Sequence, residues 1–299
     1  NFLQNSKILE NYDVCAIYKS KRPSINKNVV FIKADLTNIN ECKCLFSDYD
    51  VIFHCAGIMM TSSTLKRSPL QGLMDNLRIH LNVIDSITQK PPEKFIWLSS
   101  TTGYPLSDKP LIELDYFLNE VPTRYEIIGQ LYRLMEKTTS TILNQKCKII
   151  TLRPTGVFGE GDDFRPESSH ILPKIIREAS LEILPEVIYA QKEEMRNWLY
   201  VGDLIKAIDS VLEKVDFNVT LNLGSEKSTS MYELYLIILK FFGIERKHVI
   251  DVSNIFSLAP MARHIDCNLS FKYLGKYSST SLEGGLKNTI NWYKNVYSK

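Results

Sequence analysis

The sequence lacks several features that would each assign it to a particular class of protein. No apolar run approaches the roughly 20 residues that a membrane-spanning helix needs, and no signal-peptide pattern is visible. Positive and negative charges nearly balance at a net charge of +2, which indicates neither a nucleic-acid nor a membrane partner. With 299 residues, 44% of them hydrophobic, we expect a cytoplasmic globular protein of one large domain or two modest ones.

Cysteine and glycine are missing from the places where they would be diagnostic. The six cysteines are scattered, and the only close pair is Cys42 and Cys44. That spacing suits neither a zinc knuckle nor a redox pair, so we expect six reduced thiols and no metal site. No glycine occurs before Gly57, so the numbered residues before it hold no glycine-rich, phosphate-binding turn.

What the sequence does contain is an alternation of strand-like and helical segments. Short apolar runs rich in β-branched and aromatic residues suit strands that are buried on both faces. Five such runs are 14–18, 29–33, 51–55, 95–99 and 149–153, with helical segments such as 75–88 and 127–144 between them. This βαβα rhythm predicts an α/β fold, a Rossmann-like doubly wound parallel sheet.

The rhythm also suggests how the chain is divided. It loosens after residue 155, so we expect one domain over 1–155, with 196–224 contributing back to it, and a smaller lobe over 156–299; the resemblance described below implies that the first binds a dinucleotide and the second the substrate. Residues 1–12 read as a helix ahead of the first strand, whereas a dinucleotide-binding sheet opens with a strand and a glycine turn before that helix. Either that fingerprint was lost or the numbered chain starts just downstream of it, and we favour the second interpretation.

The stretch from Leu152 to Pro173 is the most distinctive in the chain. It begins as a strand, continues as a long loop rich in Gly, Pro and Asp, and ends with His170 at the start of a predicted helix. Enzymes with α/β folds carry their functional groups on loops that follow the carboxyl ends of parallel strands. This stretch therefore predicts one wall of an active site.

A set of short motifs, taken together and in order, resembles one family. These motifs are 34–37 (ADLT), 54–57 (HCAG), Asn76, 98–101 (LSST), 152–155 (LRPT), 196–203 (RNWLYVGD), 222–224 (NLG) and 281–286 (SLEGGL). The chain resembles the extended short-chain dehydrogenase/reductases, the nucleotide-sugar epimerases and dehydratases. Within that family, residues 158–173 look most like the GDP-fucose synthase branch.

The resemblance implies a chemistry and a set of catalytic residues. Members hold NAD or NADP across the carboxyl edge of the sheet and oxidise or reduce a sugar carbon attached to a nucleotide diphosphate. A Tyr exchanges the proton, assisted by a Lys one turn later, and a Ser or Thr binds the reacting oxygen. By this resemblance Ser100 and Tyr125 are catalytic, and His170 is an acid. Thr102 stands where the fucose-synthase branch has a Cys, and threonine is no comparable acid or base.

The resemblance also implies which residues bind the substrate and which bind the cofactor. Arg196 matches an Arg that grips the substrate diphosphate, as suits a guanidinium fork, whereas Asp203 reads as a structural helix cap. The other predicted substrate contacts are Thr101, Thr102 and Thr155. The predicted cofactor contacts are Tyr18, Lys19, Arg22, Asp35, Leu36, Ala56, Gly57 and Pro154.

The charge of the loop after the first strand bears on the choice of cofactor. An NAD enzyme usually places an acidic residue there for the ribose hydroxyl, but here the loop carries Lys19, Lys21 and Arg22. Such a run suits the 2′-phosphate of NADP, although it is also an ordinary solvated turn. We therefore expect a preference for NADP.

The Tyr-x-x-x-Lys pattern of the family is absent. Two registers are possible: with Tyr125 at the Tyr position, Gly129 stands at the Lys position. Alternatively, an anchor on Glu136 puts Tyr132 at the Lys position and Ile128 at the Tyr position. We prefer the second register for its helical spacing, but neither supplies the lysine. Without a nearby cation little phenolate forms at neutral pH, because a phenol has a pKa of about 10.

Three functional hypotheses remain open. The leading one is an NAD(P)-dependent epimerase, dehydratase or reductase acting on a nucleotide-diphosphate sugar, in surface polysaccharide synthesis. The second is a catalytically weakened member that binds dinucleotide or nucleotide sugar as a structural or regulatory module. The third is a reductase of a carbonyl compound that carries no nucleotide. Since many members pair two helices per subunit, here 75–88 and 127–144, we also expect a homodimer.

Overall fold

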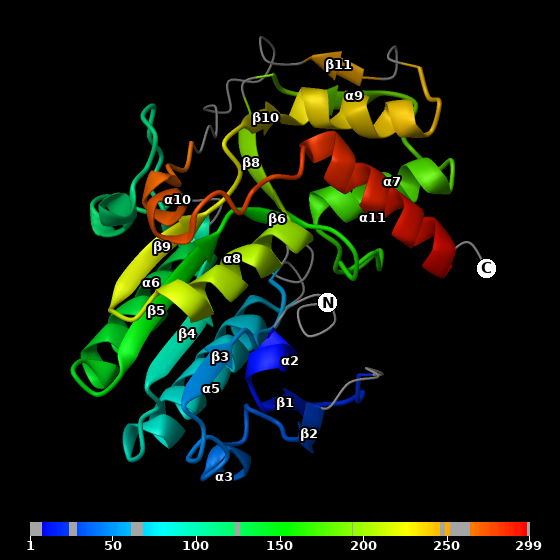
Figure 1. The fold of residues 1–299 in the computed structure, drawn as a ribbon. Coiled ribbons are helices and arrows are strands. Elements are labelled where there is room, and N and C mark those ends of the chain that lie inside the picture. The colour runs from blue at the N-terminus through cyan, green and yellow to red at the C-terminus, as the bar shows by residue number, and fades with distance from the viewer. Residues whose placement is uncertain are drawn as a thin grey trace. The chain divides into compact units, whose positions relative to one another are not determined.

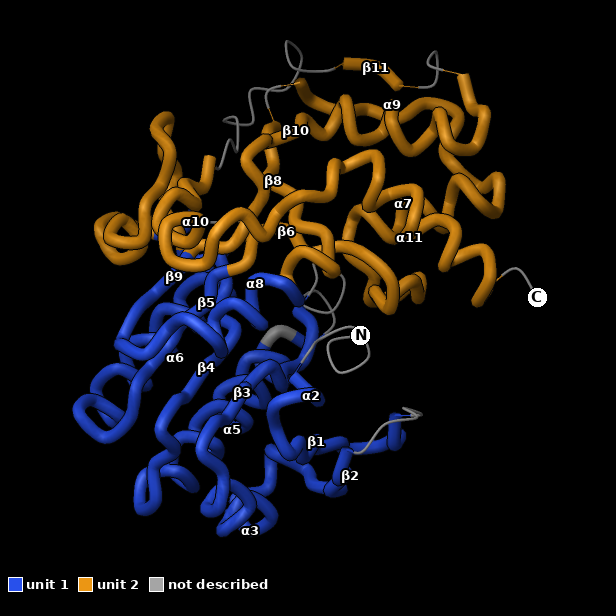
Figure 2. The backbone as a smooth tube through the Cα atoms, viewed as in Figure 1, with its two compact units in different colours: residues 1–103, 121–153, 205–221 blue, residues 104–120, 154–204, 222–299 orange. Residues whose placement is uncertain are grey.

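The computed structural model describes residues 8–23, 29–60, 68–122, 126–192, 194–245, 249–251 and 264–297. The chain forms two compact units, each built from several segments (Figure 2). Unit 1 comprises residues 1–103, 121–153 and 205–221, and unit 2 comprises 104–120, 154–204 and 222–299.

Unit 1 carries the parallel strands that the sequence predicts. β1 (Val14–Tyr18) pairs in parallel with β2 (Val29–Lys33) as a two-stranded sheet. A four-stranded sheet has the order β3 (Val51–His54), β4 (Lys94–Leu98), β5 (Lys148–Pro154) and β9 (Val219–Leu223) (Figure 1). The β3–β4 and β4–β5 pairs are parallel, so the prediction of a parallel α/β sheet is confirmed.

The helices of unit 1 are α2 (Ile8–Asn11), α3 (Ile39–Cys42), α5 (Pro69–Thr88), α6 (Glu126–Leu143) and most of α8 (Val201–Lys214). Of these, α5 and α6 bury apolar faces in one core with strands of this sheet. α5 contributes Val83, Ile84 and Ile87 to a core that also holds Phe95 and Trp97 of β4. Leu131, Met135 and Leu143 of α6 join the same core. Spacings of three and four residues on α5, and of four and eight residues on α6, place these side chains on one face of each helix.

Unit 2 is a set of short strands and helices. Its three-stranded sheet has the order β10 (Ser228–Ser230), β8 (Met195–Tyr200) and β6 (Gly156–Phe158), and β7 (Ile188–Ala190) pairs with β11 (Val249–Asp251). The helices are α7 (Ile171–Ser180), α9 (Met231–Phe241), α10 (Asn268–Leu274) and α11 (Leu282–Tyr297). Sequence analysis missed most of these strands, because three residues are too few for a period-2 pattern to show.

A few local boundaries differ from the predicted ones. α5 begins at Pro69, six residues before the predicted start, and proline favours the first turn of a helix. Of the helix predicted over residues 1–12, the structure describes only Ile8–Asn11 as helical, and residues 1–7 lie outside the described part. Among the described helices, none is long and apolar enough to span a bilayer.

Candidate functional site

The predicted cofactor residues of unit 1 follow the carboxyl ends of its strands. Lys19 comes directly after β1, Asp35 follows β2, Ala56 and Gly57 follow β3, and Ser100 follows β4. Ligands of open α/β sheets bind beyond these carboxyl ends. These residues therefore lie at the carboxyl ends of their strands, and their contact with a cofactor stays a prediction.

The first two of these positions are joined by an ion pair. Lys19 Nζ lies 2.8 Å from Asp35 Oδ2, and Asp35 Oδ1 accepts hydrogen bonds from the Thr37 amide and hydroxyl. The Lys19 ammonium, helped by Thr37, lowers the pKa of Asp35 to about 2. Arg22 lies over the ring of Phe31, with its guanidinium carbon 5.2 Å from the ring centroid. Lys19 is thus paired with a residue that follows β2, whereas Arg22 lies over the middle residue of that strand.

Leu36 and Gly57 have clear local roles. Leu36 packs against the unit 1 core, and its carbonyl accepts a hydrogen bond from Asn82 at 2.9 Å. Gly57 is exposed, and a Cβ there would lie 3.1 Å from Asn76 Oδ1. Asn76 binds both the amide and the carbonyl of Ile58, so the motif asparagine fixes the backbone that follows β3.

The loop after β4 contains the predicted catalytic serine in a tight turn. The 3₁₀ helix η1 spans Thr101–Gly103. Ser100 Oγ accepts hydrogen bonds from the Thr102 amide at 3.1 Å and from the Thr102 hydroxyl at 2.9 Å. Ser100, Thr101 and Thr102 are all half-buried, which leaves their side chains reachable by a ligand.

Helix α6 lies directly against η1. A Cβ on the buried Gly129 would lie 2.7 Å from the Thr102 carbonyl oxygen, so only glycine fits there. One turn later, Arg133 Nε donates to the Gly103 carbonyl at 2.8 Å. Position 129, where the first register would need a lysine, therefore has no room for a lysine side chain. Tyr125, the tyrosine of that register, lies outside the described residues.

The second register leads to a buried ion pair that sequence analysis did not foresee. Arg153 donates to both carboxylate oxygens of Glu136, at 2.9 and 2.6 Å, and the Ser99 hydroxyl donates to the same carboxylate at 2.5 Å. The Arg153 and Glu136 side chains are only 3% and 6% exposed. The available signal was the Leu-Arg-Pro-Thr motif, whose arginine follows a run of buried strand residues.

Tyr132, at the lysine position of the second register, packs against the unit 1 core. Burial raises the pKa of its phenol. A raised pKa keeps the hydroxyl protonated at neutral pH, so Tyr132 contributes neither a cation nor a phenolate.

In unit 2, the motif residues Thr155, Asn197 and Gly224 pack together. Asn197 Oδ1 accepts from the Thr155 hydroxyl at 3.0 Å and from the Ser225 amide at 2.9 Å. A Cβ on Gly224 would lie 2.5 Å from that same oxygen. Thr155 is 7% exposed, so its hydroxyl serves this junction, and its predicted contact with substrate stays a prediction. Pro154, a predicted cofactor contact, is the half-buried last residue of β5.

Two other motif residues of unit 2 are also structural. Asn222 Oδ1 accepts from the Tyr104 hydroxyl at 2.7 Å, and its Nδ2 donates to the Asp266 carbonyl at 3.0 Å. Asp203 is fully buried in the first turn of α8 and accepts from the Thr280 amide and hydroxyl. Asp203 therefore anchors the segment before α11, and its predicted role as a helix cap stays a prediction.

Arg196, the predicted diphosphate ligand, lies on β8 and is half-buried. Its guanidinium binds the Glu194 carboxylate through Nε at 3.2 Å and through a second, shorter bond. Arg196 also lowers the pKa of Tyr235, although burial and the charges of Glu178 and Glu194 raise that pKa to about 12 overall. A diphosphate would therefore compete with Glu194 for this guanidinium.

His170 is the N-cap residue of α7, as predicted, but makes no side-chain cap bond. Although the residue as a whole is exposed, desolvation of the ring lowers its pKa, and the nearby charge of Arg196 lowers it further. Asp163 opposes the shift. In unit 2, the charge of Arg196 therefore acts on the His170 ring. The lowered pKa keeps the imidazole mostly neutral at neutral pH, and a neutral imidazole is a poor acid.

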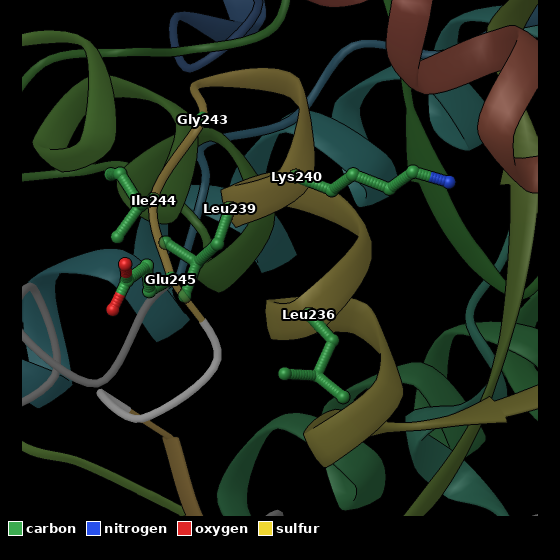
Figure 3. A pocket seen from close by; sticks show the side chains of 6 residues that line it. All are labelled: Leu236, Leu239, Lys240, Gly243, Ile244 and Glu245. Atoms are coloured by element: carbon green, nitrogen blue, oxygen red, sulfur yellow. The ribbon is translucent and has the colours of Figure 1, made fainter.

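One further hollow lies in unit 2. A hollow at the end of α9 is lined by Leu236, Leu239, Lys240, Gly243, Ile244 and Glu245, with the Lys240 side chain pointing away from Ile244 (Figure 3). No predicted site residue lines it. Within the described ranges, no group of three His, Cys, Asp or Glu could hold a metal ion. All six cysteines are free thiols.

Comparison with known proteins gives a consistent set of similarities. A model of the NAD dependent epimerase/dehydratase family matches residues 3–224. The GDP-L-fucose synthase of Azorhizobium caulinodans is 28% identical over 255 residues, which cover 82% of this chain and 80% of that protein. The GDP-L-colitose synthase of Yersinia pseudotuberculosis is 24% identical over 82% of this chain and 81% of that protein.

Two solved structures share the fold. The UDP-glucose 4-epimerase of Thermotoga maritima, solved with UDP-glucose, has a TM-score of 0.79 at 21% identity, covering 97% of this chain and 93% of that chain. The dTDP-glucose 4,6-dehydratase of Streptomyces venezuelae, a double mutant solved with NAD, has a TM-score of 0.76 at 15% identity, covering 96% and 88%.

Proposed function

This chain belongs to the NAD dependent epimerase/dehydratase family, and from that premise we propose that it is an NAD(P)-dependent epimerase, dehydratase or reductase acting on a nucleotide-diphosphate sugar. The observation that carries the proposal is the row of strand ends in unit 1. Lys19, Asp35, Gly57 and Ser100 each follow a parallel strand of that unit, at the edge where dinucleotides bind. The relatives named for sugar nucleotides support the substrate class.

The residues of unit 1 fit a dinucleotide in part. Lys19 and Arg22 offer cations beyond β1, and the exposed Ala56 and Gly57 let a ligand approach the backbone after β3. A glycine turn for the pyrophosphate is not among residues 1–56. When bound, the nicotinamide would supply hydride transfer. Because the Lys19 and Arg22 side chains suit a 2′-phosphate, we infer a preference for NADP over NAD.

We assign the nucleotide sugar to unit 2. Arg196 is the side chain whose planar fork matches diphosphate oxygens, and His170 lies within its electrostatic influence. The names of the similar proteins support a sugar carried on GDP, UDP or dTDP. A place in surface polysaccharide synthesis is our extension of this assignment.

A second candidate function follows from one specific observation in helix α6. Neither register supplies the lysine: Gly129 is packed against η1 and Tyr132 lies against the core. General acid–base catalysis contributes roughly 10²–10⁴-fold to a rate. A member that has lost it would bind dinucleotide or nucleotide sugar without efficient turnover, as a structural or regulatory module.

We also propose a homodimer in the cytoplasm. On α5 the exposed apolar residues Leu70, Met74 and Leu81 are spaced by four and seven positions, and on α6 Leu134 is 53% exposed. α5 and α6 contact each other, so these side chains favour a shared apolar surface for a second copy. The six free thiols favour a reducing compartment. Light scattering at micromolar protein that finds only monomer would contradict the dimer.

Mass spectrometry of small molecules that co-purify with the protein tests the proposed function. We expect NADP or NAD and a nucleotide-diphosphate sugar in the supernatant after denaturation. Incubation with NADP and either UDP-glucose or GDP-L-fucose, followed by chromatography, should then yield a new nucleotide sugar. Bound ligand without any product would favour the binding module, and neither ligand nor product would overturn both candidates.

A further inference from the structure

Arg196 and Glu194 form an ion pair in unit 2 whose two hydrogen bonds end on a single carboxylate oxygen. Arg196 Nε donates to Glu194 Oε1 at 3.2 Å, and Arg196 Nη2 donates to that same oxygen. In the strongest pairing of an arginine with an acid, two parallel N–H groups bind two different oxygens. The Glu194 carboxylate therefore occupies one edge of the guanidinium without the two-oxygen arrangement that its planar fork favours.

The backbone that carries this pair is fixed by its neighbours. Glu194 directly precedes β8, and residues two positions apart on an extended chain project from the same face. The Glu194 carbonyl accepts from the Met231 amide at the start of α9, at 3.0 Å, and Arg196 pairs with Thr229 of β10. The two side chains therefore meet on a fixed strand, and a change of partner needs only rotation of the Glu194 side chain.

The pair is largely shielded from solvent. The side chains of Arg196 and Glu194 are 27% and 18% exposed. The charge of Arg196 reaches His170 at the start of α7, and the charges of both partners reach Tyr235 on α9. Charges interact more strongly where water is partly excluded. A carboxylate in this place therefore opposes the binding of any anion that takes over the guanidinium.

We propose that Glu194 is an internal competitor for the diphosphate of the substrate, an inference that rests on the proposed function. It holds Arg196 while the site is empty, is displaced when a nucleotide-diphosphate sugar binds, and returns as the product leaves. An incoming diphosphate gains the guanidinium fork with two oxygens, but it must displace one carboxylate and remain beside it. Phosphate groups alone therefore bind weakly, and the nucleoside and the sugar must contribute most of the affinity.

Three variants separate this role from that of an ordinary ion pair. Glu194→Gln keeps the side-chain shape and an accepting oxygen but removes the charge, and a double variant adds Arg196→Ala to it. Glu226→Gln is the matched control, because Glu226 is also paired with a cation of unit 2, Lys276, at 3.1 Å. Isothermal titration calorimetry on the full chain gives the dissociation constants of inorganic pyrophosphate, UDP and GDP.

We expect Glu194→Gln to bind pyrophosphate about tenfold more tightly than the wild type, because a neutral amide competes less well than a carboxylate for the guanidinium. Whichever of UDP and GDP the wild type binds should gain by a similar factor. The double variant should lose this gain, and Glu226→Gln should keep the wild-type dissociation constants. Equal or weaker pyrophosphate binding in Glu194→Gln overturns the role of Glu194 while leaving the proposed function intact.

Crystal structures of the wild type with and without pyrophosphate provide a second measurement. Glu194 should bind Arg196 in the ligand-free protein and leave it when pyrophosphate is bound. A guanidinium that binds both Glu194 and pyrophosphate would make Glu194 a residue that orients Arg196, and the inference would be wrong. Absence of binding of all three compounds to every protein, Glu194→Gln included, would overturn the diphosphate site itself and with it the proposed substrate class.

Discussion

At the scale of single residues, Arg196 offers the most direct test of the proposed nucleotide-sugar substrate. Its guanidinium is already paired with Glu194, so a diphosphate has to replace that carboxylate. Hydrogen bonds to charged groups are worth roughly 1.5–3 kcal/mol. We predict that Arg196→Ala raises KM for the nucleotide sugar by about 10- to 100-fold, as measured by steady-state kinetics.

The control for this prediction is Lys276→Ala in the same unit. Lys276 is also paired with a glutamate, Glu226, but both side chains are more than half exposed. Its removal should leave KM unchanged, because exposed ion pairs contribute little. Equal KM values for Arg196→Ala and wild type would remove the diphosphate clamp from the proposal.

The choice between NADP and NAD is also expected to depend on single residues. Arg22 lies over Phe31, whereas Lys19 is held by Asp35 at 2.8 Å, so Arg22 is the cation more available to a 2′-phosphate. We predict that Arg22→Ala weakens NADP binding by about tenfold or more and leaves NAD binding unchanged. Fluorescence titration with both dinucleotides measures this, and equal weakening of the two would refute a 2′-phosphate contact.

At the scale of elements, the buried pair of Glu136 on α6 and Arg153 on β5 joins a helix to the sheet. Ser99, at the end of β4, donates to the same carboxylate, so three elements meet there. Removing one partner of a buried pair leaves the other charge uncompensated, at a cost of about 3–5 kcal/mol. We predict a loss of that size in the free energy of unfolding of Glu136→Ala, measured by urea denaturation.

The surface pair of Lys90 and Asp48 provides the comparison. Its atoms are 2.6 Å apart, similar to the buried pair, but its side chains are 66% and 82% exposed. Asp48→Ala should leave the unfolding midpoint unchanged. If both alanine variants unfolded at the same urea concentration, burial of the Glu136 pair would not be what makes it stabilising.

At the scale of the whole molecule, two buried histidines tie stability to pH. The rings of His54 and His80 lie 5.4 Å apart in unit 1, beside Phe95 and Trp97. The Thr139 hydroxyl donates to the Met135 carbonyl, so His80 Nε2 must be the donor in its 2.8 Å bond to Thr139. His80 Nδ1 has no partner among the described residues, so protonating it would bury an unpaired donor.

The pKa shifts give the direction of the pH dependence. Burial lowers the pKa of His54 to about 4 and that of His80 to about 3, against about 6.5 in an unfolded chain. Below about pH 6.5 the unfolded state therefore binds protons that the folded state does not, and stability falls as pH falls. The slope is about 1.4 kcal/mol per pH unit for each histidine until the folded pKa is reached.

We predict that the free energy of unfolding declines between about pH 6.5 and pH 4, and that His54→Phe makes this decline less steep. Phenylalanine keeps an aromatic ring next to His80 and Phe95 but has no proton to bind. Urea denaturation followed at several pH values measures the slope. An identical slope in the variant and the wild type would show that His54 does not titrate as its burial implies.

Much of the fold and part of the site follow from local sequence. The runs at Val14–Tyr18 and Val29–Lys33 form strands with the predicted bounds, because β-branched and aromatic residues favour the extended backbone. The predicted burial on both faces is wrong for these two strands, since no residue of either is fully buried. Placing functional residues after strand ends needs only strand direction, so Ser100 could be located in advance. The three-residue strands of unit 2 could not, since their hydrogen bonds depend on partners distant in sequence.

The sequence alone determined the parallel α/β fold and the family, because these depend on the order of motifs and on a hydrophobic rhythm that local residues encode. Only the tertiary structure decided what each side chain does. It paired Glu136 with Arg153, directed Thr102 at Ser100 and placed Gly129 against η1. Side-chain partners are chosen by packing between elements, and no local pattern specifies which of several polar residues will meet once the core has formed.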